Sequence, residues 1–275
     1  MGYALMRRSR PVRGLALAVL PPSLRRRLRG VTEVPWSVDG LEFTVPLSLL
    51  WIFEEEPGTV AYLRKVLRPG MTAVDVGANV GSLSLVMGSA VGPTGRVIAV
   101  EPGPESLRWL RRNIERNHVA NVTVVNAAAG ACPGRRSFHV EDTLVLGSFY
   151  DHPRTKPRCS LEVEQKTLDE LVPDGADLVK IDVEGAELEV LQGASRLLAS
   201  SPRLVVEWCP ATLIAAGQSP TAILSTLTEL GYHFTMIDDQ RPDVTSTATL
   251  GELADRADNG TLPPYFYVNL ACERR

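Results

Sequence analysis

Short apolar runs alternate with segments of helical composition from Met71 onward, and this order limits the fold more than any other feature of the chain. Five runs have the length and the aliphatic composition of buried parallel strands, and they span residues 72–76, 96–100, 122–125, 178–182 and 203–208. Helices are expected at residues 82–91, 104–117, 186–199 and 221–230. Strands and helices in this order predict an α/β fold, with helices on both faces of a mostly parallel sheet.

Segments outside this alternation complete the expected architecture. Residues 233–237 and 265–271 are expected to be the last two strands, which makes a seven-stranded sheet. A small β insertion is expected from residues 136–140 and 160–166, on either side of a polar stretch, 147–158, that is typical of a mobile loop. Earlier in the chain we expect a hairpin around Asp39-Gly40, at 36–45, and a helix at 54–67 that is broken near Pro57-Gly58.

The first strand of the alternation runs into the sequence VDVGANVG at residues 74–81. Ligands of open α/β sheets bind at the carboxyl ends of the strands, so this turn is a candidate binding loop. Gly77 and Gly81 allow a tight turn and a close approach of a ligand to the backbone, and the next helix points its free N–H groups at the turn. Asn79 stands where a dinucleotide fingerprint has its second glycine, which favours an adenosyl-amino-acid cofactor over NAD. A strand-to-helix turn without a ligand is the alternative.

The second and third strands end in residues that suit a nucleoside. Glu101 lies about 20–25 residues beyond the glycine loop, the spacing at which an acid accepts the ribose hydroxyls; capping of the next helix is the alternative. Asn126 precedes small side chains, so it can present its amide to an adenine edge, unless this segment is simply a turn. The predicted cofactor-binding residues are Asp75, Gly77, Ala78, Asn79, Gly81, Glu101, Pro102, Asn126 and Ala127.

Carboxylates at the ends of the fourth and fifth strands are the candidate catalytic groups. Asp182, Glu184 and Glu187 fall within six residues, and crowded acids raise one another's pKa, which suits a general base. Glu187 also suits the start of a helix, and Glu207 also suits a surface position at a strand exit. Lys180 either shares the face of Asp182 or packs elsewhere. The predicted catalytic residues are Asp182, Glu184 and Glu207.

Charge and cysteine patterns exclude several classes of function. The formal net charge is −3, yet residues 1–32 carry eight arginines and no acid, so the remainder is acidic and poorly suited to nucleic acid. The four cysteines are scattered without the spacing of a zinc site, and no metal site is predicted. Mg²⁺ held by the three candidate catalytic carboxylates is kept as the alternative.

The arginine-rich start is expected to be a basic extension, residues 1–35, ahead of a main domain, residues 36–275. Its apolar stretch, residues 15–20, is far shorter than the roughly 20 residues of a membrane-spanning helix, so we expect a cytoplasmic protein. A peripheral contact of this basic segment with an anionic membrane, or a secretory signal, is the alternative. The oligomeric state is not readable from the sequence.

Five motifs together resemble the FkbM family of S-adenosylmethionine-dependent methyltransferases: VDVGANVG at 74–81, VEP at 100–102, TLDEL at 167–171, KIDVEGAELEVLQGA at 180–194 and VVEW at 205–208. The resemblance covers residues 50–210 and implies a Rossmann-like class I methyltransferase fold. It also implies methyl transfer, usually to a hydroxyl of a small-molecule or glycan acceptor such as a sugar, a glycolipid or a secondary metabolite. The resemblance implies that Gly77, Asn79, Gly81 and Glu101 contact the cofactor. It also implies that Asp182 and Glu184 lie near the reacting hydroxyl.

Three other functions are alternatives to methyl transfer to a hydroxyl. An NAD-dependent oxidoreductase lacks its glycine fingerprint here and any evident proton donor. An RNA methyltransferase would have to reach its substrate through the basic start of the chain, and the only Pro-Pro-aromatic sequence, at 263–265, is misplaced for one that acts on bases. A methyltransferase-like module that binds without turnover is the third rival.

Overall fold

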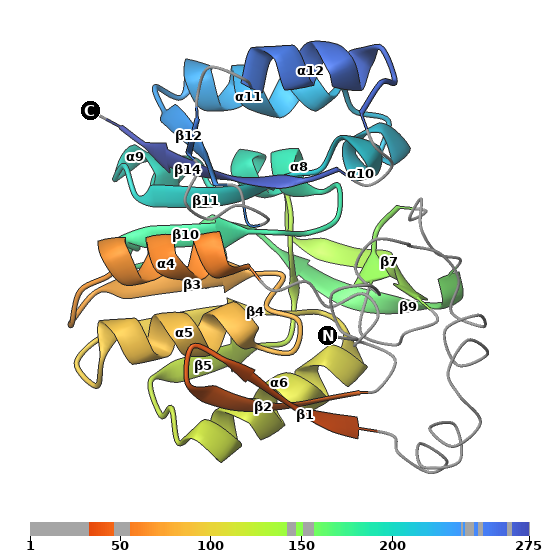
Figure 1. The fold of residues 1–275 in the computed structure, drawn as a ribbon. Helices are drawn as coiled ribbons and strands as arrows, with labels where there is room; N and C mark the ends of the chain where they lie inside the picture. The colour runs from red at the N-terminus through yellow and green to blue at the C-terminus, as the bar shows by residue number, and fades with distance from the viewer. Residues whose placement is uncertain are drawn as a thin grey trace, which may run out of the picture.

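A central eight-stranded sheet forms the body of the computed structural model, which describes residues 33–46, 56–141, 147–150, 157–237, 239, 245–246, 250–262 and 266–274. Across the sheet the strands follow the order β13-β12-β14-β11-β10-β3-β4-β5 (Figure 1). Their bounds, in that order, are Thr245–Ser246, His233–Ile237, Val268–Glu273, Arg203–Trp208, Leu178–Ile181, Thr72–Val76, Arg96–Val100 and Val122–Val125.

The five strands β11, β10, β3, β4 and β5 pair in parallel, whereas β14, β12 and β13 pair antiparallel. The predicted mostly parallel sheet of seven strands is therefore confirmed, and the two-residue β13 adds an edge. The last strand begins at Val268 rather than at 265, because its register is set by pairing with both β11 and β12.

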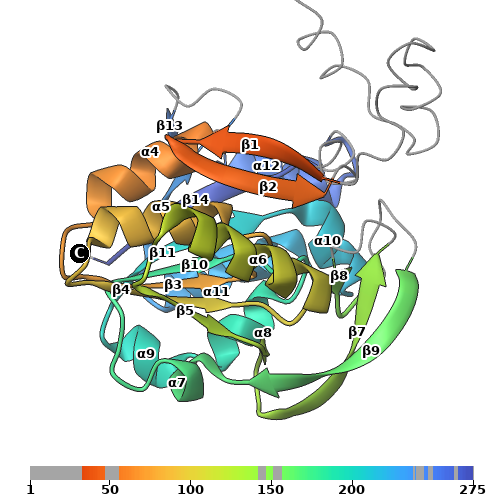
Figure 2. The same cartoon turned by 90° about the horizontal axis from the view of Figure 1, so that it is seen from below.

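Helices cover both faces of the sheet because the apolar side chains of its strands alternate between two clusters. On one face, α4 (Pro57–Val66), α5 (Ser82–Val91) and α6 (Pro104–Asn117) pack against strand residues such as Ala73, Val97 and Ala99. On the other face, α8 (Glu187–Gln192), α9 (Ser195–Ala199) and α11 (Pro220–Glu229) pack against Val74 and Ile181 (Figure 2). Three short or late helices were not predicted: α7 (Leu168–Leu171), α10 (Pro210–Ala215) and α12 (Leu250–Asp258).

The single helix predicted over residues 186–199 is wrong, since the chain forms α8 and α9 with a break at Gly193. At this glycine a Cβ would lie 2.0 Å from the carbonyl oxygen of Gly130, so the chain turns where two backbones touch. The helix predicted over residues 54–67 begins as α4 at Pro57, where its break was predicted, and residues 54–55 lie outside the described part.

The predicted hairpin is confirmed as β1 (Glu33–Val38) and β2 (Leu41–Pro46), with positive φ angles at both residues of its Asp39-Gly40 turn. It lies along α6 (Figure 2), where the buried side chain of Asn113 joins it to the glycine loop. Asn113 Oδ1 accepts from the Thr44 N–H at 2.9 Å, and Asn113 Nδ2 donates to the Val80 carbonyl at 2.9 Å. These two hydrogen bonds therefore link the hairpin to the loop that follows β3 and fix the position of that loop.

The β insertion is also confirmed, as a separate sheet of order β6-β9-β7-β8 beside the carboxyl ends of the main strands (Figure 1). Its strands are Ala128–Ala129, Pro157–Lys166, Gly134–Glu141 and Gly147–Ser148, in that order. Tyr150 donates to Glu189 of α8, and Arg136 forms an ion pair with the same carboxylate at 2.5 Å. The insertion is thus tied to the helix that follows β10.

Two predictions fall largely outside the described residues. They are the basic extension with its membrane contact and the loop at 151–156, within the stretch predicted as mobile. In the part of the chain that is described, every helix is too short or too polar to cross a membrane.

Candidate active site

A cavity opens at the carboxyl ends of the parallel strands, between the central sheet and the β insertion. Most of the predicted site residues line it: Asp75, Gly77, Ala78, Asn79, Glu101, Pro102, Ala127, Asp182, Glu184 and Glu207. Gly81 and Asn126 do not line it. Gly81 faces Leu110 of α6, and Asn126 is exposed to solvent. Their roles toward a cofactor stay predictions.

The strand order divides the cavity wall into two halves. The glycine-loop half, at the ends of β3, β4 and β5, contains residues 75–79, Glu101 and residues 127–129. The acid half, at the ends of β10, β11 and β14, contains Lys180, Asp182, Glu184, Glu207 and Tyr267, together with Glu56 at the start of α4.

In the glycine-loop half, Gly77 turns the chain with a φ of +85° against the end of β10. A Cβ at this position would lie 1.8 Å from the carbonyl oxygen of Asp182. The loop therefore brings the end of β3 into direct backbone contact with the segment that carries the predicted base.

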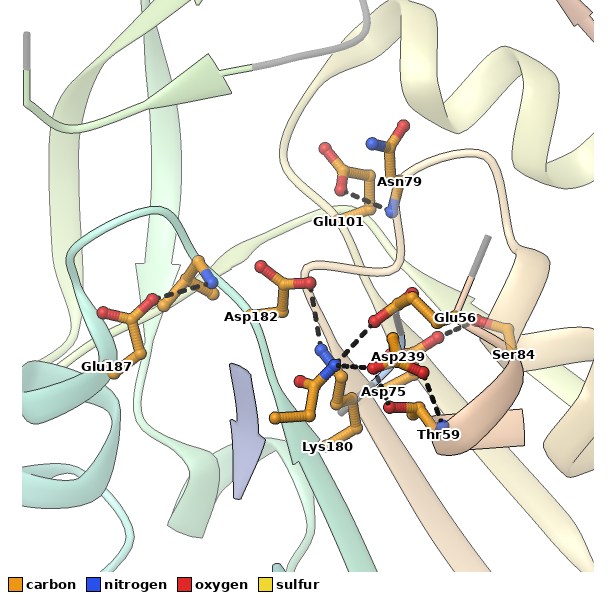
Figure 3. A network of polar contacts seen from close by, with 12 residues as sticks. Glu56, Thr59, Asp75, Asn79, Ser84, Glu101, Lys180, Asp182, Glu187 and Asp239 are labelled. Carbon is orange, nitrogen blue, oxygen red and sulfur yellow. Dashed lines mark hydrogen bonds and ion pairs between the residues drawn. The ribbon is translucent and has the colours of Figure 1, made fainter. Parts of the chain in front are cut away.

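Glu101 holds the loop from the neighbouring strand (Figure 3). Its Oε2 accepts from the Asn79 N–H at 2.9 Å and its Oε1 accepts from the Gly103 N–H at 2.7 Å. Burial raises the pKa of Glu101 to about 7, although both backbone donors oppose that rise. The side-chain oxygen of Asn79 is buried without a hydrogen-bond partner among the described residues, so it is an acceptor that a ligand's donor can satisfy.

Asp75 joins β3 to α5, because its buried carboxyl accepts from the Ser84 hydroxyl at 2.5 Å. Burial raises the pKa of Asp75, with the hydrogen bond from Ser84 opposing it. Asp75 lines the cavity, and the contact with Ser84 holds its side chain against the start of α5.

In the acid half, Lys180 is the central group and is only 1% exposed. Its Nζ lies 2.9 Å from Asp182 Oδ2, while the Asp182 side chain keeps 29% of its surface exposed (Figure 3). Burial alone lowers the pKa of Lys180, but the negative charges of Asp182, Glu56 and Glu207 outweigh it and raise that pKa. The sequence left two roles open for Lys180, and the structure places it on the face of Asp182.

Polar side chains from distant segments surround this ion pair (Figure 3). Asn269 Nδ2 of β14 donates to Glu56 Oε1 at 2.8 Å and to Asp239 Oδ2 at 3.1 Å. Asp239 in turn accepts from the backbone N–H and the hydroxyl of Thr59, at 2.7 and 2.9 Å. Burial raises the pKa of Glu56 to about 7, with Lys180 opposing the rise. The start of α4 is thereby tied to the last strand.

The other carboxyl groups of this region differ in their surroundings. Burial raises the pKa of Glu207 well above its usual value, and the charges of Asp182 and Glu184 add to the rise. Glu184 sits in a left-handed turn, with a φ of +52°. Glu187 is buried away from the cavity lining and accepts from the N–H groups of Val183 and Gly185, each at 3.2 Å, so it holds the turn before α8.

The Mg²⁺ alternative finds no support in this geometry. Among the described residues, no group of three or more His, Cys, Asp and Glu side chains is arranged to hold a metal ion. Beside Asp182, the ammonium group of Lys180 already supplies the positive charge.

Several residues that line the cavity were not predicted from the sequence. Glu56 precedes the Pro57-Gly58 pair, a helix-start signal that draws attention to the cap and not to a site. Tyr267 lies just before the last strand, and Phe138 and Phe149 come from the β insertion, where their rings meet edge to face at 5.7 Å. Phe149 lies in the polar stretch at 147–158, and irregular segments of this kind often contribute to binding sites.

The sequence matches the model of the methyltransferase FkbM domain over residues 75–234. It is 32% identical over 133 residues to a protein-L-isoaspartate O-methyltransferase of Triticum aestivum, covering 47% of this chain and 54% of that protein. It is 30% identical over 159 residues to the hexuronic acid methyltransferase AglP of Haloferax volcanii, covering 56% of this chain and 60% of that protein. The chain therefore spans little more than half the length of these relatives.

Among solved structures, the methyltransferase FkbM of Methylobacillus flagellatus KT matches 64% of this chain and 46% of its own, with 19% identity and a TM-score of 0.43. The family match covers more than half of this chain and includes the glycine loop, Glu101 and the segment from Lys180 to Glu207. The predicted Rossmann-like, class I methyltransferase fold is confirmed. The chain belongs to the FkbM family of S-adenosylmethionine-dependent methyltransferases.

Proposed function

We propose that this chain transfers a methyl group from S-adenosylmethionine to a hydroxyl of a sugar, a glycolipid or a secondary metabolite. The observation that carries the proposal is one cavity lined both by the glycine loop with Glu101 and by a carboxylate paired with a buried ammonium. The first wall suits the cofactor, and the pair suits removal of a proton from a weakly acidic hydroxyl.

The glycine-loop half fits S-adenosylmethionine. Glu101 has lone pairs left after accepting two backbone N–H groups, so it can also accept the ribose hydroxyls. The unpartnered Asn79 oxygen offers a further acceptor. The small residues 127–129, beside Phe138 and Phe149, leave an apolar wall for a flat adenine ring. When bound, the cofactor supplies a methyl group that its sulfonium has already activated.

Asp182 is the base in this proposal. Lys180 binds its Oδ2, which fixes the carboxylate at the cavity wall and leaves Oδ1 to receive the hydroxyl proton. Glu207 has a different role: burial raises its pKa well above the usual value, and its protonated form can donate to an oxygen of the acceptor. Glu184, at the cavity rim in its left-handed turn, contacts the acceptor as well.

The two relatives support a hydroxyl or carboxyl oxygen as the methyl acceptor. One is named for a hexuronic acid and the other for isoaspartate, and both names describe methylation of oxygen-rich groups. Small-molecule or glycan acceptors are favoured over nucleic acid, since the described residues that line the cavity include several acids and one lysine.

Calorimetric titration with S-adenosylmethionine, and separately with NAD(H), tests the cofactor half of this proposal. We expect micromolar binding of S-adenosylmethionine that Glu101→Gln weakens by at least about tenfold, the worth of a charge-assisted hydrogen bond. Glu115→Gln, on an exposed position of α6, is the matched control and should bind as the parent does. Preference for NAD(H), or no binding, would make the proposal wrong.

The acceptor half is tested by methyl transfer to a library of hydroxyl compounds. Transfer by the parent chain that Asp182→Asn lowers by at least about a hundredfold, with S-adenosylmethionine binding retained, is the expected result for a general base. Cofactor binding without transfer to any member of a broad library would favour a binding module instead.

A further inference from the structure

Phe149, which follows the short strand β8, brings an aromatic ring of the β insertion to the cavity wall. Its ring meets that of Phe138 edge to face at 5.7 Å, and it packs against the apolar cluster that contains Phe138 and Ala128. Gly147 makes this packing possible, because a Cβ at that position would overlap the ring of Phe138. The ring of Phe149 is therefore part of an apolar surface that the insertion builds at the cavity.

The residues on both sides of Phe149 are tied to the segment that follows β10. Ser148 is 2% exposed, and its hydroxyl donates to the Glu184 carbonyl at 2.8 Å while it accepts from the Tyr150 N–H at 3.1 Å. The Tyr150 hydroxyl donates to Glu189 of α8. The chain is thus held one position before and one position after Phe149, which limits where its ring can lie.

The guanidinium of Arg136 supports the same ring. Its Cζ lies 4.1 Å from the centre of the Phe149 ring, and the guanidinium forms an ion pair with Glu189 at 2.5 Å. A cation over an aromatic ring is attracted by the π electrons, so Arg136 helps to hold the ring in place. Because Glu189 binds both Arg136 and Tyr150, one carboxylate of α8 restrains the position of Phe149 in two ways.

The part of the cavity lining around Phe149 suits an uncharged, flat ring. Its other members are residues 127–129, Phe138 and Gly147, and none of these described residues carries an ionisable side chain. Glu101, just after β4, suits the ribose, and residues 127–129 follow the neighbouring strand β5. The adenine is uncharged, planar and bonded directly to the ribose. It is therefore the portion of S-adenosylmethionine that fits beside Phe149.

We propose that Phe149 is the residue of the β insertion that recognises the adenine of S-adenosylmethionine, and that Ser148, Tyr150 and Glu189 are positioning residues for its ring. This inference rests on the proposed function. The contact buries apolar surface, and fixed aromatic rings gain further from stacked or edge-to-face packing. Since the ring is held before the ligand arrives, binding costs little of its freedom of rotation. The three positioning residues do not line the cavity and act through Phe149.

Calorimetric titration with S-adenosylmethionine and with 5′-methylthioadenosine, which lacks the amino-acid portion, tests the contact. Phe149→Ala should raise the Kd of both ligands by the same factor, about tenfold, because both carry the adenine. Phe149→Leu keeps an apolar side chain in the insertion without the aromatic ring, and it should raise both Kd values about threefold.

Leu161→Ala is the matched control for damage to the insertion. Leu161 packs against the same apolar cluster and pairs with Phe138 across the strands, but it does not line the cavity. The variant should bind both ligands as the parent chain does.

A double-mutant cycle tests the positioning residues. Tyr150→Phe removes only the hydroxyl that donates to Glu189, and it should raise the Kd of S-adenosylmethionine about threefold. In the Phe149→Ala background the same change should have no effect, because the ring that it positions is gone. Ser148→Ala and Glu189→Gln should follow the same pattern. General damage to the fold would weaken binding in both backgrounds alike.

Three results overturn the inference while leaving the proposed function intact. One is a Phe149→Ala variant that binds S-adenosylmethionine as the parent does, and a raised KM for the methyl acceptor in that variant would assign the ring to the acceptor. Another is weaker binding of S-adenosylmethionine alone, with 5′-methylthioadenosine unaffected, which would place the ring beside the methionine portion. The third is an equal effect of Tyr150→Phe in both backgrounds. Failure of the parent chain to bind S-adenosylmethionine would instead refute the proposed function, and the inference with it.

Discussion

The two halves of the cavity are built in opposite ways. The glycine-loop half comes from one continuous turn and the end of the next strand, and the carboxyl of Glu101 is held by two backbone N–H groups. The acid half is assembled from segments that lie far apart, as in the contact of Asn269 with Glu56 across 213 positions. A short motif specifies the first half, whereas the whole sheet has to form before the second half exists.

The two halves of the cavity therefore differ in the interactions that keep their residues in place. Backbone geometry restrains the glycine loop, so its weak points are positions where a side chain cannot fit. Mutual attraction and repulsion of buried charges restrain the acid half, so its weak points are the charges themselves. Substitutions in each half should therefore fail for different reasons.

The largest effect is expected from Gly77→Ala. Its Cβ would overlap the Asp182 carbonyl oxygen at 1.8 Å, and because both partners are backbone, neither can move aside cheaply. We expect a loss of more than about 4 kcal/mol in the free energy of unfolding, measured by denaturant titration. Gly175→Ala is the control, since its φ is also +85° but its Cβ would meet no atom within 4 Å. It should cost only about 1 kcal/mol. Equal losses in the two variants would show that backbone conformation, and not the contact with β10, restrains the loop.

Lys180→Met should have the next largest effect, in the acid half. The change leaves Asp182, Glu56 and Glu207 without their shared cation, although part of Asp182 can still reach water. We expect a loss of about 2–3 kcal/mol, below the value for a fully buried pair. Lys65→Met, on the exposed side of α4, should change stability by less than about 0.5 kcal/mol. If the Lys180→Met variant is as stable as the parent chain, the carboxyl groups take up protons and need no cation.

Asn113→Ala tests whether the glycine-loop half keeps its structure without its contact to the β1–β2 hairpin. The change leaves the Thr44 N–H and the Val80 carbonyl without partners in a buried place, for a loss of about 2 kcal/mol. Asn117→Ala removes two hydrogen bonds to Glu42 at the exposed end of the same helix and should cost less than about 1 kcal/mol. If Asn113→Ala also weakens S-adenosylmethionine binding while Asn117→Ala does not, the loop depends on the hairpin as well as on its own turn.

The same contrast explains what the sequence could predict. Apolar runs and their breaks located the parallel strands, and parallel strands end at one edge, so Asp75, Glu101 and Asp182 could be placed together without coordinates. The pattern of strands does not predict whether a given side chain at a strand end points into the cavity. Asn126 follows its strand as Glu101 does, yet it faces solvent.

Residues outside the alternating pattern could not be placed. Glu56 and Tyr267 enter the site only because β14 lies beside β11 and its Asn269 reaches the start of α4. That neighbourhood depends on antiparallel pairing across the whole chain, which no local pattern encodes. The break at Gly193 was missed for a similar reason, since its cause is the backbone of Gly130, 63 positions away.

The smallest expected effect concerns the proton on Glu101. Burial raises its pKa to about 7 from 4.5, so the neutral form is favoured in the folded chain. Its contribution to stability is full below about pH 4.5 and is lost as the pH rises through 7. Ribose hydroxyls donate to the ionised form, so binding of S-adenosylmethionine should lower this pKa and release a fraction of a proton near pH 7.

Calorimetry at pH 7 in buffers of different ionisation enthalpy measures that release directly. Burial also raises the pKa of Glu56 to about 7, in a setting that includes Lys180, Asp182, Asp239, Glu207 and Tyr267. Glu56→Gln should keep most of the release if the proton comes from the glycine-loop half, and Glu101→Gln should abolish it. The reverse result would mean that the cofactor's charge draws the proton from the acid half, and that the two halves respond to one ligand as a single electrostatic unit.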